Sequence, residues 1–123
     1  MAEERGPFSG KRVLIAEDDG LIAEDLRALV ERQGGIVVIM APTTAGALAA
    51  VERHAVDLAL LDVRLGDGTA EDVARALRAR RIPFIVVTGY ARDGLPPLLR
   101  DAPFVAKPYL PRELAAVAAL LLG

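Results

Sequence analysis

Five short apolar runs alternate along the chain with longer segments of mixed polarity. The runs occupy residues 13–16, 36–40, 58–61, 83–87 and 104–106. An unbroken apolar run of this length, bounded by turn-forming residues, is typical of a β-strand that is buried on both faces. The pattern therefore predicts five strands, with enough chain between successive strands for a helix.

The segments between and after these runs carry helix signals. Helical spacing of apolar residues, or an abundance of alanine, predicts helices over residues 21–33, 45–53, 70–80 and 111–122. Candidate N-terminal caps precede the first three helices: Asp19 or Gly20, then Thr43 or Thr44, then Thr69.

The segment between the fourth and fifth runs gives the weakest helix signal. Residues 93–100 contain Pro96 and Pro97. Proline disrupts a helix interior because it lacks an N–H donor and its ring clashes with the preceding turn. We therefore expect the fourth helix of the fold to be short, irregular or displaced.

The alternation of strands and helices predicts an α/β fold with a parallel sheet, because connections of this length are crossovers that place helices on both faces. A strand order of 2-1-3-4-5 would bring the first and third strands together. Residues 1–10 are polar and contain Gly6, Pro7 and Gly10, so we expect a flexible lead-in to one domain over residues 11–123. No linker to an effector domain is predicted.

Composition narrows the possible functions. The 123 residues are 53% hydrophobic and 26% charged, as suits a compact core. A net charge of -2 does not indicate a nucleic-acid-binding protein. The lack of cysteine excludes disulfides, thiolate metal sites and cysteine nucleophiles. No apolar run approaches the roughly 18 residues that span a bilayer, so we expect a cytoplasmic protein that does not bind a membrane.

Four of the predicted strands end at residues that can do chemistry. Glu17 and Asp18 follow the first strand, Asp62 the third, Thr88 the fourth and Lys107 the fifth. The carboxyl ends of parallel strands lie along one edge of the sheet, where ligands bind in open α/β folds.

These groups suit phosphoryl transfer. Neighbouring carboxylates repel one another unless a cation intervenes, and hard oxygen ligands on an accessible edge suit Mg²⁺. A threonine hydroxyl and a lysine ammonium suit phosphate oxygens, and an aspartate can itself become an aspartyl-phosphate. The sequence therefore predicts a magnesium-dependent phosphoryl site.

Each residue also has an ordinary structural interpretation when taken alone. Asp18 or Asp19 could cap the first helix, Thr88 could be a strand-end hydroxyl, and Lys107 could be a solvated lysine. The only histidine, His54, is expected to be an ordinary residue near a helix end. The joint occurrence of the reactive groups at four strand ends favours the chemical interpretation.

The chain resembles the receiver domain of two-component response regulators. The resemblance covers residues 11–122 and depends on the motifs at residues 13–19, 57–62, 87–89 and 106–108. It implies a flavodoxin-like, three-layer (βα)5 sandwich. The segment from Pro83 to Tyr90 is also similar to that of a receiver subclass, many of whose members are single-domain proteins, so a stand-alone receiver is expected.

The resemblance implies a role for each residue of the magnesium-binding part of the site. Asp62 would be the phosphoacceptor, which takes its phosphoryl group from a phosphohistidine. The donor would be a sensor histidine kinase or a histidine phosphotransfer protein. Glu17 and Asp18 would be the acid pair for Mg²⁺, joined by Asp62 and by the backbone carbonyl of Arg64.

The resemblance also implies how the signal leaves the site. Thr88 and Lys107 would bind the phosphoryl oxygens, and Thr88 would move towards the phosphorylated aspartate together with a switch aromatic, Phe104 or Tyr90. Arg64 and Tyr90 lie two residues past Asp62 and Thr88. Both are large enough to shield the phosphoryl group from water, so slow self-dephosphorylation is expected.

The implied function is a bacterial signalling switch in a phosphorelay, and not an enzyme in the ordinary sense. We expect a monomer or weak homodimer whose downstream protein partner the sequence does not name. The alternative is a pseudo-receiver, an interaction module that works without phosphorylation. A haloacid-dehalogenase-like hydrolase is disfavoured, because it needs a second aspartate where this chain has Arg64.

Overall fold

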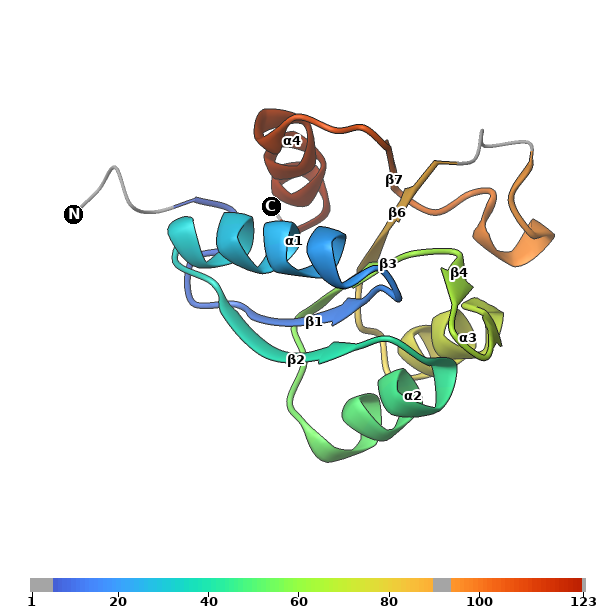
Figure 1. Ribbon diagram of the computed structural model, residues 1–123. Helices are drawn as coiled ribbons and strands as arrows, with labels where there is room; N and C mark the ends of the chain where they lie inside the picture. The colour runs from blue at the N-terminus through green and yellow to red at the C-terminus, as the bar shows by residue number, and fades with distance from the viewer. Residues whose placement is uncertain (1–5, 90–93, 123) are drawn as a thin grey trace.

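The computed structural model describes residues 6–89 and 94–122 and contains a parallel five-stranded sheet (Figure 1). The strands are β1 (Arg12–Ala16), β2 (Ile36–Ala41), β3 (Leu58–Leu61), β6 (Phe84–Thr88) and β7 (Phe104–Ala106), in the order β2-β1-β3-β6-β7. These are the five predicted strands. The predicted order 2-1-3-4-5 and the flavodoxin-like fold are therefore confirmed.

Helices cover both faces of the sheet (Figure 1). One face packs against α1 (Gly20–Arg32) and α4 (Pro111–Leu122), and the other against α2 (Thr44–Arg53) and α3 (Glu71–Ala79). Alternate residues of β3 supply the two cores: Leu58 and Leu60 face the α1 side, while Ala59 and Leu61 face the α2 side. This alternation explains why the strand is apolar at every position.

The connection between β6 and β7 lacks a regular fourth helix in its described part, residues 94–103. It contains a short 3₁₀ helix, η3 (Pro97–Leu99), which begins directly after Pro96. Leu95 and Leu99 are buried in the same core as α2 and α3. The predicted shortening is confirmed, and the two buried leucines fasten the segment to the domain.

A small antiparallel hairpin after β3 was not predicted. It consists of β4 (Arg64–Leu65) and β5 (Gly68–Thr69). Because Thr69 belongs to this hairpin, the expectation that it caps α3 is wrong: the capping position is Ala70, which makes no side-chain bond. The other two caps are confirmed, since Asp19 accepts from the first turn of α1 and Thr43 from that of α2.

The packed domain begins before the expected boundary at residue 11. Residues 7–10 form a turn, and Phe8 is fully buried in the core beneath α1 and α4. The N–H of Lys11 donates to the Phe8 carbonyl (2.9 Å), and the N–H of Gly10 donates to that of Gly34 (3.0 Å). Residues 6–10 are therefore part of the folded unit.

Within the part of the chain that the structure describes, no helix is both long and apolar enough to cross a membrane.

Candidate functional site

The carboxyl ends of four strands bring the predicted reactive residues together. Glu17 follows β1, Asp62 follows β3, Thr88 ends β6 and Lys107 follows β7. With Asp18, they line one cleft of about 340 Å³ at the edge of the sheet. The sequence could predict this set because parallel strands in register deliver the residue after each strand to the same edge.

Lys107 is the centre of the site. Its ammonium donates to Glu17 Oε1 (2.7 Å) and to Asp62 Oδ2 (3.2 Å). Glu17 and Asp62 are 3% and 9% exposed, so both carboxylates face the lysine from largely buried positions. The backbone N–H of Lys107 also donates to the Thr88 carbonyl (2.8 Å), which fixes the end of β7 against β6. The interpretation of Lys107 as a solvated lysine is therefore wrong.

Backbone donors hold the second oxygen of each buried carboxylate. The N–H of Val63 donates to Asp62 Oδ1 (2.7 Å), and the N–H of Asp19 donates to Glu17 Oε2 (3.1 Å). These contacts orient both side chains. Oδ2 of Asp62 is the oxygen turned towards Lys107.

Burial and charge perturb the protonation of the site. Burial raises the pKa of Glu17 to about 7, against the opposing effect of its hydrogen bond from Lys107. Burial also disfavours the Lys107 ammonium, but the hydrogen bond to Glu17 and the charge of Asp62 outweigh it and raise the pKa of Lys107. The lysine therefore remains a cation beside Asp62 and Glu17.

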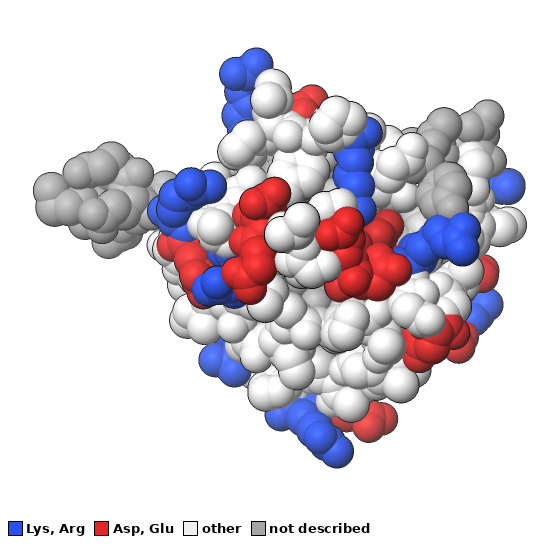
Figure 2. Space-filling view, viewed as in Figure 1, with Lys and Arg blue, Asp and Glu red and all other residues white. Residues whose placement is uncertain are grey.

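The donor set fits a magnesium ion. Glu17, Asp18 and Asp62 each offer a carboxylate oxygen, and these oxygens lie within 4.8 Å of one another. Asp18 is exposed, and Figure 2 shows acidic side chains gathered on the surface near the start of α1. Mg²⁺ takes few protein carboxylates and keeps several waters, so a site open on one side suits it. Asp19, and not Asp18, caps α1, so helix capping does not account for Asp18.

Of the remaining predicted residues, two line this cleft, one lies away from it and one lies outside the described residues. Arg64 lines the cleft, and Thr88 is 1% exposed. Phe104, at the far end of β7 from Lys107, is half-buried against the α2–α3 core. Tyr90 lies outside the described residues.

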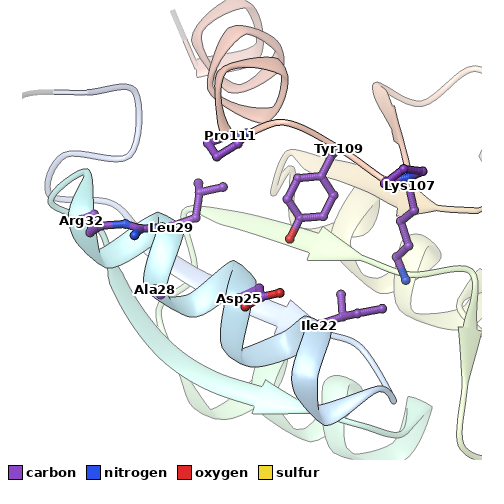
Figure 3. Close-up of a pocket in the computed structure, with 9 residues that line it drawn as sticks. Ile22, Asp25, Ala28, Leu29, Arg32, Lys107, Tyr109 and Pro111 are labelled. Atoms are coloured by element: carbon purple, nitrogen blue, oxygen red, sulfur yellow. The ribbon is translucent and has the colours of Figure 1, made fainter.

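A second hollow adjoins the site and was not predicted. It measures about 650 Å³ and lies between α1 and the segment from Lys107 to Pro111. Figure 3 shows the Tyr109 ring reaching across it towards the side of α1 that carries Asp25. Burial and the charge of Asp25 raise the pKa of Tyr109. The only indication of this hollow in the sequence is that Tyr109 lies two residues after Lys107.

Comparison with known sequences identifies the family. The family model for the response regulator receiver domain matches residues 13–119. "Transcriptional regulatory protein PdtaR" of Mycobacterium tuberculosis is 33% identical in an alignment of 103 residues that covers 80% of this chain and 50% of that protein. "Sensory transduction protein RegX3" of Mycolicibacterium smegmatis is 38% identical in an alignment of 112 residues that covers 85% of this chain and 47% of that protein. The chain thus spans about half the length of these curated relatives.

Solved structures share the fold. The response regulator PhyR from Brucella abortus superposes with a TM-score of 0.83 at 33% identity, over 97% of this chain and 49% of that one. The receiver domain of the sensor histidine kinase PA1611 from Pseudomonas aeruginosa, solved with a magnesium ion in its active site cleft, has a TM-score of 0.78 at 25% identity. That match covers 94% of this chain and 99% of the other. The chain belongs to the response regulator receiver domain family.

Proposed function

We propose that this chain is a phosphoacceptor that receives a phosphoryl group on Asp62 from a phosphohistidine. The donor is a sensor histidine kinase or a histidine phosphotransfer protein. One observation carries the proposal: the Lys107 ammonium joins Asp62 Oδ2 to Glu17 within a cleft that also contains Asp18. This arrangement places a nucleophile, a cation and further carboxylates at one point.

The contacts of Asp62 favour one of its oxygens as the proposed nucleophile. Oδ1 accepts from the N–H of Val63, so Oδ2 is the oxygen placed to form the new bond to phosphorus. The bond between phosphorus and the donor's imidazole nitrogen breaks, and its electron pair stays on that nitrogen. Lys107 then exchanges its contact with the carboxylate for a phosphoryl oxygen, and Thr88 contacts another.

Magnesium completes the charge balance of the proposed site. Glu17, Asp18, Asp62 and the backbone carbonyl of Arg64 would hold it. When bound, the ion would supply positive charge as negative charge builds on the transferring group. The residues of the chain orient the acceptor and keep the buried carboxylates in place.

The phosphorylated site acts as a switch. New charge at Asp62 draws Thr88 inward, and the end of β6 passes this change to β7, where Phe104 packs. We propose that Tyr90 is a switch aromatic alongside Phe104 or in its place, and that it helps to shield the phosphoryl group. Arg64, beside the cleft, would slow self-dephosphorylation by shielding the phosphoryl group.

Incubation with Mg²⁺ and acetyl phosphate tests the proposal directly. We expect intact-mass spectrometry to detect one added phosphate per chain, because a small donor bypasses the need for a kinase. The adduct should be absent when Mg²⁺ is removed with a chelator. A chain that takes no phosphate from several small donors or from its cognate kinase would instead be a pseudo-receiver.

Asp18→Asn tests the metal assignment separately. We expect the magnesium dissociation constant from isothermal titration calorimetry to rise at least about tenfold, because one anionic ligand becomes neutral. Asp19→Asn is the matched control: it removes a neighbouring charge, but asparagine caps a helix as well as aspartate does. Equal effects of the two substitutions would contradict a ligand role for Asp18.

A further inference from the structure

We propose that Asp67 is a positioning residue for the magnesium-binding edge of the site. Its carboxylate ties the β4–β5 hairpin to the start of α2, and so fixes the backbone of the chain that follows Asp62. The inference rests on the proposed function, because it concerns the geometry of the same site.

The carboxylate of Asp67 spans the first turn of α2. Oδ1 accepts from the backbone N–H of Thr44 (2.5 Å) and Oδ2 from that of Ala45 (3.1 Å). These two donors, like all N–H groups in the first turn of a helix, have no partner within the helix itself. Their bonds lower the pKa of Asp67, so the carboxylate stays charged. The bonds cross 23 and 22 residues of sequence.

Two further bonds fasten the hairpin to the same segment. The N–H of Gly66 donates to the carbonyl of Pro42 (2.9 Å), and the hydroxyl of Thr44 donates to the carbonyl of Thr69 (3.1 Å). A side chain at Gly66 would come within 3.4 Å of that carbonyl, so the two segments run close together. The hairpin is therefore attached near its tip and at its far strand.

The fastened hairpin begins at the metal site. Arg64, its first residue, lies two positions after Asp62, and its backbone carbonyl is the proposed ligand. The segment that contacts the hairpin follows directly on the end of β2, and that strand end is also bonded to Glu17. The N–H of Glu17 donates to the carbonyl of Ala41 (3.0 Å), the last residue of β2. The end of β2 and the residues that lead into α2 therefore contact both the backbone at Glu17 and the hairpin that follows Asp62, and Asp67 joins that hairpin to the first turn of α2.

Capping of α2 alone does not account for Asp67. Thr43, the residue that precedes the helix, already supplies a local cap by accepting from the N–H of Gly46 (3.0 Å). Asp67 is exposed and adds a link that Thr43 does not make, because it comes from another part of the chain. The two residues therefore provide a matched pair of variants.

The test compares Asp67→Ala with Thr43→Val, which removes the local cap but keeps the shape of the side chain. Both should lower the melting temperature. Only Asp67→Ala should raise the magnesium dissociation constant measured by calorimetry, by roughly tenfold, as residues that orient metal ligands do. Asp67→Asn should fall between Asp67→Ala and wild type, because its amide oxygen still accepts. Phosphate uptake by Asp67→Ala should recover at saturating Mg²⁺.

Unchanged magnesium affinity in Asp67→Ala, or an equal loss in Thr43→Val, would overturn the inference and leave Asp67 a simple cap. Wild-type protein that binds no Mg²⁺ would overturn it too. Wild-type protein that binds Mg²⁺ but takes no phosphate would refute only the proposed function, and the comparison of the two variants would still decide the role of Asp67.

Discussion

Asp62→Asn is expected to abolish phosphate uptake from acetyl phosphate, since a neutral amide oxygen is too weak a nucleophile to form the bond to phosphorus. The substitution keeps the size of the side chain and one oxygen that can accept from the N–H of Val63. We therefore expect the variant to fold. Intact-mass spectrometry should detect no adduct under conditions in which wild-type protein is fully labelled.

Asp57→Asn is the matched control for this loss. Asp57 precedes β3 at its other end, where Oδ2 accepts from the N–H of Arg12 (2.8 Å), a bond that asparagine can also make. Its labelling should equal that of wild type. An adduct that persists in Asp62→Asn would show that another carboxylate is the acceptor, and peptide mapping would then locate it.

The sequence predicts the fold and the main site because both depend on local signals. The apolar runs mark the strands. In a parallel sheet, the residue that follows each strand lies at the carboxyl edge, regardless of the conformation of the loops. Thus local signals place Asp62 and Lys107 along one edge of the sheet, whereas their meeting in one cleft depends on the strand order.

Features that depend on distant contacts were missed. Residues 63–69 carry only turn signals, and the role of Asp67 depends on donors more than 20 residues away in sequence. Phe8 lies among glycine and proline, which suggested a flexible lead-in. It is buried because Gly35 leaves it room: a Cβ at Gly35 would lie 3.2 Å from that of Phe8 and 2.5 Å from Val30 Cγ1.

Lys107→Ala is expected to slow phosphate uptake by about 100- to 1,000-fold, the range seen when one preorganised donor to a developing charge is removed. The substitution also leaves Glu17 and Asp62 facing each other without the cation that both contact. We expect a loss of about 2 kcal/mol in the free energy of unfolding, as for hydrogen bonds to charged groups. Stopped labelling reactions and urea denaturation measure the two effects.

Two substitutions separate charge from geometry at this position. Lys11→Ala removes the only other lysine, which lies before β1, and should leave labelling unchanged. Lys107→Arg keeps the positive charge and should retain most of the stability, but labelling should still fall because a planar guanidinium cannot replace a compact ammonium between two carboxylates. Wild-type labelling in Lys107→Ala would mean that the lysine only neutralises Glu17 and does not contact the transferring group. The contrast between the two variants at position 107 therefore determines whether Lys107 acts on the carboxylates, on the phosphoryl oxygens or on both.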